Sequence, residues 1–361
     1  MAVSNHGMSQ PQNDGAMACR NVDHMKRDAM WSSKAKKHLR QAVDRLLFRV
    51  KQPPENIPRK RDEWSIGIYI GRSPFEFASP EDIHNPVLTR KDVADAQAVF
   101  VADPFMLRVD QTWYMFFESM NRQTKRGDRE NRPTKKGEIG LAISDNAVKW
   151  TYQQIVLAEP FHLSYPYVFE WMGDYYMVPE SYQARTVRLY RAERFPTHWS
   201  LAATLLSGGV FLDPSIFRYH DRWWMFAETN PHHKYDTLRL YYADDLLGPW
   251  HEHRQSPIIE GNPHLARPGG RILVLNDRVI RYAQDCFPVY GTHVRAFEVT
   301  GLTRQHYREQ PVREQAILAA SGAGWNECGM HHIDPHLLDD GQWLACVDGF
   351  LWQDGSDAIP Q

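Results

Sequence analysis

Acidic side chains recur along this chain at a regular distance from proline. Asp103 and Asp213 each precede a proline, and Glu118, Glu180 and Glu228 each lie about fifteen residues beyond a residue that precedes a proline. Carboxyl groups held close together raise one another's pKa, so some stay protonated near neutral pH while others stay ionised. That combination suits paired acid and base catalysis, above all the cleavage of a glycosidic bond.

The proline pairs also mark a repeat of strands. A residue followed by proline opens a predicted strand five times, at Asp103, Tyr165, Asp213, Arg267 and Asp334, with spacings of 62, 48, 54 and 67 residues. Each pair is followed by a second strand rich in aromatic residues, and no helical periodicity lies between them. A recurrence of about one four-stranded sheet is typical of a β-propeller. The sequence therefore predicts an all-β, five-bladed β-propeller.

The repeat predicts which side chains meet. The innermost strands of a propeller surround one axis, so equivalent residues at their starts converge on a small pocket. We expect this pocket to hold Asp103, Tyr165, Asp213, Arg267, Asp334, Glu118, Glu180 and Glu228. Tyr165 would offer a flat apolar face to a sugar ring. An aspartate before proline can also simply cap a turn, but three aspartates at equivalent repeat positions favour the functional interpretation.

Several motifs resemble known families. Residues 101–105 (Val-Ala-Asp-Pro-Phe) and 212–217 (Leu-Asp-Pro-Ser-Ile-Phe) resemble the acidic motifs of the five-bladed propellers of glycoside hydrolase family 43. Residues 64–69, 162–170 and 332–336 resemble more closely the propeller domain at the N-terminus of plant glucosamine inositolphosphorylceramide transferases and of bacterial relatives. The resemblance implies the propeller fold and a carbohydrate substrate.

The resemblance to family 43 implies roles for individual residues. Asp103 matches the general base that activates water, and Asp213 matches the aspartate that orients and tunes the acid. The family has a glutamic general acid on the inner strand of the next unit, where this chain has Arg267. We therefore expect another carboxyl to supply the proton, with Glu180 as the first candidate and Glu228 as the second. The leading hypothesis is an inverting glycoside hydrolase.

Arg267 leaves further interpretations open. It can neutralise the surrounding carboxylates. Alternatively, with Arg271 nearby, its guanidinium can hold an anionic group of the substrate, because guanidinium groups bind phosphate and carboxylate in a bidentate manner. Substrates would then be phosphorylated or acidic sugars, or phosphate would replace water as the nucleophile.

A second functional hypothesis follows from the closer likeness, which covers roughly residues 64–350. In the plant proteins the propeller accompanies a transferase domain, for which this chain has no room. The chain would then be a non-catalytic glycan-binding or accessory module that works beside a glycosyltransferase on another chain.

Histidines gather near the predicted strand starts. His162 precedes the second unit, and His332 lies in the fifth, within a group that also contains His331 and His336. Their ring nitrogens could bind sugar hydroxyls or a metal. No ligand spacing is diagnostic, so we predict substrate contacts for His162 and His332, no metal and no cofactor.

The segment before the propeller reads as a separate region. Residues 1–62 are predicted to hold a disordered tail and a basic amphipathic helix over 34–50, and the propeller to span 63–361. Such a helix can dock on protein or lie on an anionic membrane surface, and both remain open. The charged stretch 121–130 is too polar for the core and is expected to form a long mobile loop, which could act as a lid over the axial face.

Composition limits the classes of partner. With 24% charged residues and a formal net charge of -2, the chain lacks the positive field that nucleic acid binding needs. Its four cysteines show no CxxC pair and no zinc-ligand spacing. The first thirty residues lack an apolar core of the secretory type. We therefore expect a cytoplasmic protein that does not bind nucleic acid.

Overall fold

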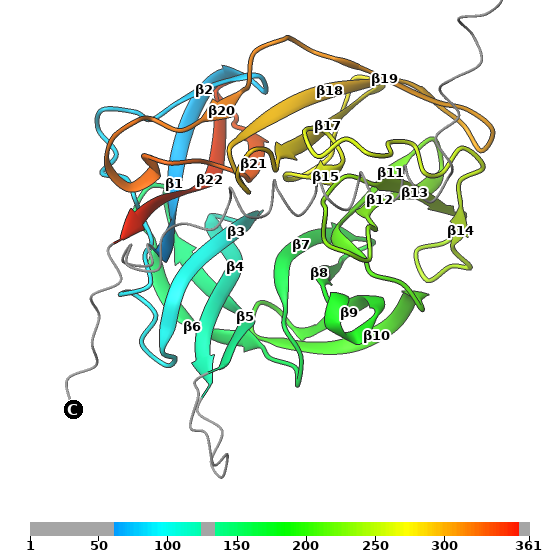
Figure 1. Cartoon of the computed structure of the whole chain (residues 1–361). Helices are drawn as coiled ribbons and strands as arrows, with labels where there is room; N and C mark the ends of the chain where they lie inside the picture. Colours follow the sequence, from blue (N-terminus) through cyan, green and yellow to red (C-terminus); the bar gives the residue numbers. More distant parts are fainter. Residues whose placement is uncertain (1–60, 124–133, 354–361) are drawn as a thin grey trace, which may run out of the picture. The chain divides into compact units, whose positions relative to one another are not determined.

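The computed structural model describes residues 61–123 and 134–353, which form five antiparallel sheets around a central axis (Figure 1). The predicted five-bladed all-β propeller is confirmed. Within the described ranges the only helical segments are two 3-10 turns, Tyr182–Ala184 and Gly324–Asn326. None of these described segments is long and apolar enough to span a membrane.

Two sequence-based expectations fall outside the described residues. The helix predicted over 34–50, with the membrane contact considered for it, precedes the first described residue. Most of the charged loop predicted over 121–130 lies in the gap between the two described ranges. Both stay predictions.

The first three blades each consist of four strands in chain order. Blade 1 contains β3 (Ala98–Val109), β4 (Thr112–Gln123), β5 (Thr134–Ser144) and β6 (Thr151–Leu157). Blade 2 contains β7 (Ser164–Trp171), β8 (Asp174–Glu180), β9 (Thr186–Arg194) and β10 (His198–Ser207). Blade 3 contains β11 (Leu212–Tyr219), β12 (Arg222–Glu228), β13 (Leu238–Ala243) and β14 (His251–Glu252).

The last two blades depart from this simple order. Blade 4 contains β15 (Arg267–Pro268), β16 (Leu273–Leu275), β17 (Arg278–Asp285), β18 (His293–Leu302), β19 (Tyr307–Pro311) and β20 (Leu318–Ala319). Blade 5 joins both described ends of the chain: β21 (Ile333–Leu337) and β22 (Trp343–Gln353) pair with β1 (Arg61–Ser73) and β2 (Glu76–Ala78).

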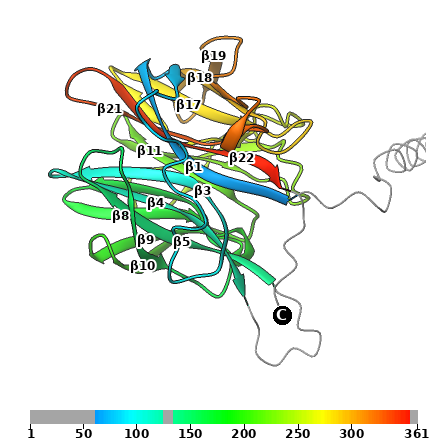
Figure 2. The same ribbon diagram turned by 90° about the vertical axis from the view of Figure 1, so that its left-hand side faces the viewer.

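The ring is closed by the pairing of β1 with β22. Ile70 lies opposite Leu344 and Arg61 opposite Gln353, and Figures 1 and 2 both show the two strands side by side. An early strand of the described chain thus completes the last blade. In blade 5 the strand β22 is thereby covered by β1 on one side and by β21 on the other.

Apolar side chains between the blades form the core. One buried cluster draws Phe116 from blade 1, Val168 and Met177 from blade 2, and Ile216 and Met225 from blade 3. Alternate residues of each strand point to opposite faces of a sheet, so each blade packs against both neighbours. This packing fixes the blades, and hence their inner strands, relative to one another.

The inner strands of blades 1 to 3 share an unusual backbone. The residue before proline has a left-handed φ of 53° at Asp103, 46° at Tyr165 and 48° at Asp213. Pairing with the second strand slips at the same place in all three, and proline has no N–H to give to the ladder. Left-handed backbone costs a non-glycine residue of order 1–3 kcal/mol, so surrounding contacts must hold it.

Carboxylates of the preceding blade hold this backbone. The N–H of Asp103 donates to Asp348 Oδ2 at 2.9 Å, that of Tyr165 to Asp103 Oδ2 at 3.3 Å, and that of Asp213 to Glu180 Oε2 at 2.9 Å. Each contact joins one blade to the next across the axis. The strained backbone and the acidic side chains are therefore parts of one arrangement.

Candidate active site

Polar side chains occupy equivalent positions near the ends of the second strands. They are Glu118, Glu180, Glu228, Gln284 and Asp348. The three glutamates were predicted from the sequence, whereas Gln284 and Asp348 were not. The same count along the aromatic-rich strand, from Trp113 to Glu118 and from Trp343 to Asp348, would have found Asp348.

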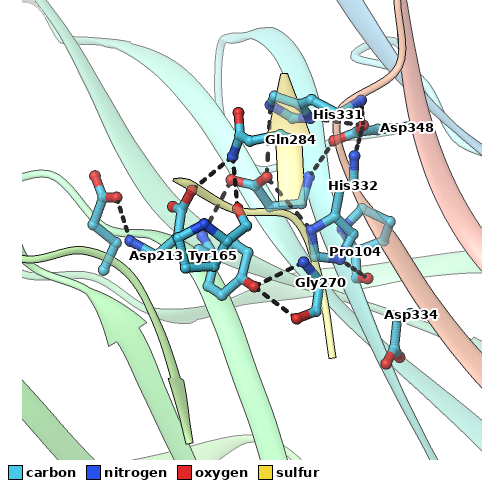
Figure 3. A network of polar contacts seen from close by, with 12 residues as sticks. Pro104, Tyr165, Asp213, Gly270, Gln284, His331, His332, Asp334 and Asp348 are labelled. Carbon is cyan, nitrogen blue, oxygen red and sulfur yellow. Dashed lines mark hydrogen bonds and ion pairs between the residues drawn. The ribbon is translucent and has the colours of Figure 1, made fainter. Parts of the chain in front are cut away.

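Asp213 is fixed by a buried ion pair. Arg267 Nε donates to Asp213 Oδ2 at 2.6 Å and Arg267 Nη2 to Oδ1 at 3.3 Å. Gln284 Nε2 also donates to Oδ2, at 2.8 Å (Figure 3). Asp213 is 1% exposed and Arg267 is 7% exposed. Such a pair fixes both groups in one orientation, because either charge alone would be very costly to bury.

Glu180 extends this cluster. Besides accepting the N–H of Asp213, its Oε2 lies 3.5 Å from Arg267 Nη2. Burial first, and then the charge of Asp213, raise the pKa of Glu180 well above its usual value. The structure thus brings the predicted acid Glu180, the predicted tuner Asp213 and Arg267 together.

Asp103, on blade 1, contacts both neighbouring blades: its N–H donates to Asp348 on blade 5, and its Oδ2 accepts the N–H of Tyr165 on blade 2. Burial raises its pKa to about 7, with the charges of Asp213 and Asp348 adding to the effect and His331 opposing it. Asp103 is 7% exposed, more than Asp213. A carboxyl with this pKa is partly ionised at neutral pH, as a general base should be.

Two neighbouring histidines face Asp103. His332 Nε2 donates to the carbonyl oxygen of Pro104 at 2.9 Å, so in the neutral ring Nδ1 carries no proton; it lies 3.8 Å from Asp103 Oδ1. Burial lowers the pKa of His332 to about 4. His331 instead bonds Asp348 through Nδ1 at 2.8 Å and stacks on Trp64. His332 was predicted at the site, and its position next to Asp103 gives that prediction a geometric basis.

The same corner contains the one group among the described residues that could hold a metal ion. Asp103, His331 and Asp348 each offer a ligand atom, and these atoms lie within 4.8 Å of one another. His331 and His332 hold the pKa of Asp348 below its usual value even though burial opposes this. Asp348 is therefore the ionised member of the corner, next to the partly protonated Asp103.

Glu118 and His162 form a separate pair. The N–H of Gly137 donates to His162 Nδ1 at 2.9 Å, so a neutral ring carries its proton on Nε2, which lies 3.6 Å from Glu118 Oε1. Burial lowers the pKa of His162 to about 4. Burial and then the charges of Asp103 and Glu180 raise the pKa of Glu118 well above its usual value.

Glu228 serves the loop that follows its own strand. Its Oε1 accepts the N–H groups of Asn230 at 2.9 Å and Thr237 at 3.3 Å. Its side chain is fully buried, and burial raises its pKa to about 7. These contacts hold the two ends of the β12–β13 loop, so the structure gives Glu228 a different set of partners from Glu180.

Tyr165 contributes through its backbone and its hydroxyl. The hydroxyl contacts Ser215 Oγ at 2.8 Å, donates to the carbonyl of Gly270 at 2.9 Å and accepts the Gly270 N–H at 2.9 Å (Figure 3). The ring is fully buried against Phe105 and His332. Because neither face of the ring is exposed, Tyr165 does not offer the stacking surface for a sugar that the sequence predicted.

Asp334 lies apart from the other acids (Figure 3). Its carboxylate pairs with Arg271 and with His336, at 2.8 Å, and accepts the N–H of Met106 at 2.6 Å. Despite burial, Arg271 and His336 hold its pKa well below the usual value. Arg271 also donates to the carbonyl of Val168. The structure thus separates Asp334 from the cluster it was expected to join and makes it a tie between blades.

Aromatic residues cover Arg267. Its guanidinium lies 4.7 Å from the ring centre of Tyr235 and 5.1 Å from that of Tyr290. These tyrosines come from the loops after β12 and β17 and also contact each other. Loop residues carry no repeat signal, so these tyrosines could not be predicted from the sequence.

The described residues also enclose a groove of about 550 Å³ between blades 2 and 3, lined in part by Arg185, Phe211, Thr229, Arg239, Tyr241 and Glu252.

Most of the chain matches a known protein family. Residues 58–350 match the family described as glucosamine inositolphosphorylceramide transferase 1, N-terminal. The chain is 36% identical over 313 residues to the glucosamine inositolphosphorylceramide transferase 1 of Oryza sativa subsp. japonica, covering 81% of this chain and 41% of that protein. It is 32% identical over 306 residues to the Arabidopsis thaliana protein of the same name, covering 79% and 39%. The chain thus spans about two fifths of these relatives.

Solved structures share the fold at low identity. A glycosyl hydrolase from Bacteroides ovatus superposes with a TM-score of 0.53 and 11% sequence identity, over 81% of this chain and 96% of that one. At this identity the likeness shows the propeller fold alone.

Proposed function

Because this chain belongs to the family of the N-terminal domain of glucosamine inositolphosphorylceramide transferase 1, we propose that its axial cluster acts on a carbohydrate and hydrolyses a glycosidic bond with inversion. The supporting observation is a buried cluster whose carboxyls differ in protonation: Asp103, with a pKa of about 7, is partly ionised at neutral pH, while the pKa values of Glu118 and Glu180 are raised well above the usual value. Glycoside hydrolysis requires one carboxylate and one carboxylic acid at the same site.

Asp103 is the base in this proposal. Its pKa of about 7 leaves much of it ionised at neutral pH, so it can take a proton from water as the water oxygen bonds to the anomeric carbon. The bond between that carbon and the leaving oxygen breaks, and the leaving oxygen receives a proton from a carboxylic acid. Asp213, held by Arg267 and Gln284, sets the charge that the acid experiences.

Two neutral carboxyls are candidates for the acid. Glu180, predicted from the sequence, contacts the Asp213 N–H and Arg267. Glu118 occupies the equivalent position one blade earlier. The contacts of Arg267 with Asp213 and Glu180 favour the interpretation that it neutralises carboxylates, since a substrate anion would have to compete with both.

A second function has its own support. The curated relatives are named as transferases, and this chain spans only about two fifths of their length. The axial acids are also nearly closed to solvent. Both observations favour a glycan-binding or accessory module that works beside a glycosyltransferase.

Substrate screening separates the two functions. The wild-type protein, Asp103→Asn and the surface control Asp339→Asn, whose side chain is 90% exposed, are each assayed on aryl glycosides and native oligosaccharides. Loss of turnover by about 10²-fold or more in Asp103→Asn alone would support hydrolysis, a size typical for removal of a general base. Saturable sugar binding without turnover, equal in all three proteins, would support the module and reject the hydrolase.

A further inference from the structure

One carboxyl of the axial cluster is free where its counterparts are engaged. Asp348 and Glu180 each accept the N–H of a left-handed residue on the next blade, at Asp103 and Asp213. The corresponding donor for Glu118 is the N–H of Tyr165. That N–H donates instead to Asp103 Oδ2. Glu118 is therefore the member of this set that the backbone does not hold.

The surroundings of Glu118 leave its Oε1 without a hydrogen bond. This oxygen is buried and has no partner among the described residues. His162 Nε2 lies 3.6 Å from this oxygen, beyond hydrogen-bond distance. His162 cannot come closer freely, because its ring Nδ1 accepts the Gly137 N–H and its backbone N–H donates to Gln183 Oε1.

Gly137 packs tightly against this pair. A Cβ added at position 137 would collide with the carbonyl oxygen of Leu163 and would lie 2.7 Å from the His162 ring and 2.9 Å from Glu118 Oε1. Only glycine therefore lets β5 lie this close to Glu118 and His162, and a larger residue would have to displace them.

A buried carboxylate without hydrogen bonds would be very unfavourable, particularly among other acids. The neutral acid avoids that cost and carries an O–H that needs an acceptor. Glu180 is less suited to hold a proton, because its Oε2 accepts the Asp213 N–H and lies 3.5 Å from Arg267, and both contacts favour its ionised form.

We propose that Glu118, rather than Glu180, is the catalytic acid that gives its proton to the leaving oxygen of the glycoside. This inference rests on the proposed hydrolysis and deepens it. As the glycosidic C–O bond breaks, the Glu118 proton moves to the departing oxygen, while Asp103 takes a proton from the attacking water. The products are an alcohol and a sugar with a free anomeric hydroxyl. Exchange with solvent then returns a proton to Glu118 and removes one from Asp103.

The test compares Glu118→Gln with the matched variant Glu180→Gln on two substrates. One is a dinitrophenyl glycoside, whose leaving group needs no proton, and the other is the phenyl or alkyl glycoside of the same sugar. Glu118→Gln is expected to lose about 10²- to 10⁴-fold in kcat/KM on the poor leaving group and less than about tenfold on the activated one. Glu180→Gln is expected to lower both rates by a similar factor.

The outcomes separate this inference from the function on which it rests. Equal losses on both substrates in Glu118→Gln, or leaving-group dependence in Glu180→Gln, would reject Glu118 as the acid while hydrolysis stands. If the wild type turns over neither substrate, the hydrolase and the acid role fail together.

Infrared difference spectra give a readout apart from turnover. At pH 7 the protonated carboxyl band of the wild type is expected to lose the intensity of one group in Glu118→Gln, because other buried carboxyls keep theirs, and to stay whole in the control Glu138→Gln, whose carboxylate is paired with Lys136. An unchanged band intensity in Glu118→Gln would show that Glu118 is ionised and overturn the inference.

Discussion

The inner strands of blades 1 to 3 and those of blades 4 and 5 differ in backbone, although each carries a residue followed by proline. Asp103, Tyr165 and Asp213 are left-handed. Arg267 and Asp334 lack a positive φ and stay in the ladder, opposite Gln284 and Cys346.

The difference depends on whether the preceding blade offers a carboxylate that can accept a hydrogen bond from the inner strand. Where Asp348, Asp103 or Glu180 is available, the next inner strand is left-handed and its N–H is bonded. Before blade 4, the counterpart Glu228 is engaged with its own loop. Before blade 5, the counterpart Gln284 donates to Asp213. Proline is therefore found at the start of all five inner strands, whereas the left-handed backbone occurs only where a carboxylate of the preceding blade accepts the N–H.

The two regions also differ in charge. Blades 1 to 3 supply acids at the axis, whereas blade 4 supplies arginines. Arg267 pairs with Asp213, and Arg271 pairs with Asp334 on blade 5. These contacts predict that the paired acids depend on the arginines of blade 4 for their stability in the folded protein.

Removal of Arg267 is expected to have the largest effect on stability. Arg267→Met leaves Asp213 and Glu180 buried without their cation, which should lower the free energy of unfolding by about 3–5 kcal/mol. Urea denaturation at pH 7 measures it. Arg278→Met removes an exposed pair with Glu298 and should cost less than about 1 kcal/mol. A comparable small loss in Arg267→Met would contradict the dependence of the acids on blade 4.

The pH dependence of stability should separate Asp103 from Asp334. The pKa of Asp103 is raised to about 7 in the folded protein, so the native state binds more protons than the unfolded one, and stability falls as pH rises from about 4 to 7. The shift corresponds to a few kcal/mol across this window. Asp103→Asn should flatten the fall, as measured by denaturation at several pH values.

Asp334 should act in the opposite direction. Its pKa is lowered by Arg271 and His336 despite burial, so its contribution is present above the unfolded pKa of about 4 and is lost as pH falls below it. Asp334→Asn should flatten only the acid limb. If both variants changed the same limb, the contrast between the two regions would be refuted.

The hydroxyl of Tyr165 should have a smaller effect. Tyr165→Phe removes contacts with Ser215 and with both backbone groups of Gly270, leaving buried polar groups unpaired at a cost of about 1–3 kcal/mol. Thermal unfolding measures the change. Tyr219→Phe loses one hydrogen bond of a half-exposed side chain and serves as the control. Equal shifts in the two melting temperatures would argue against a blade-to-blade tie at Tyr165.

The repeat of proline pairs was enough to predict the five blades. It located the strand starts because proline and the aromatic-rich second strand are local features. The left-handed backbone could not be predicted in the same way. Its φ depends on acceptors that are distant in sequence, such as Asp348 for Asp103.

The same limit explains the position of Asp334. Without the bulge of the first three inner strands, β21 keeps Asp334 in register with Cys346, and its side chain meets Arg271 rather than Asp103. Equal spacing from proline therefore did not mean equal placement. Tyr235 and Tyr290 lie on loops of unrelated sequence, so no repeat could connect them with Arg267.

The pairing of β1 with β22 has a consequence for how the protein is made. On the ribosome, the first propeller strand to emerge must wait for the last one, because Arg61 lies opposite Gln353. Every other blade can assemble from neighbouring segments, whereas the fifth needs both extremes of the described chain. Joining residues 353 and 61 with a short linker and opening a surface turn elsewhere would yield a circular permutant in which every blade is built from contiguous polypeptide.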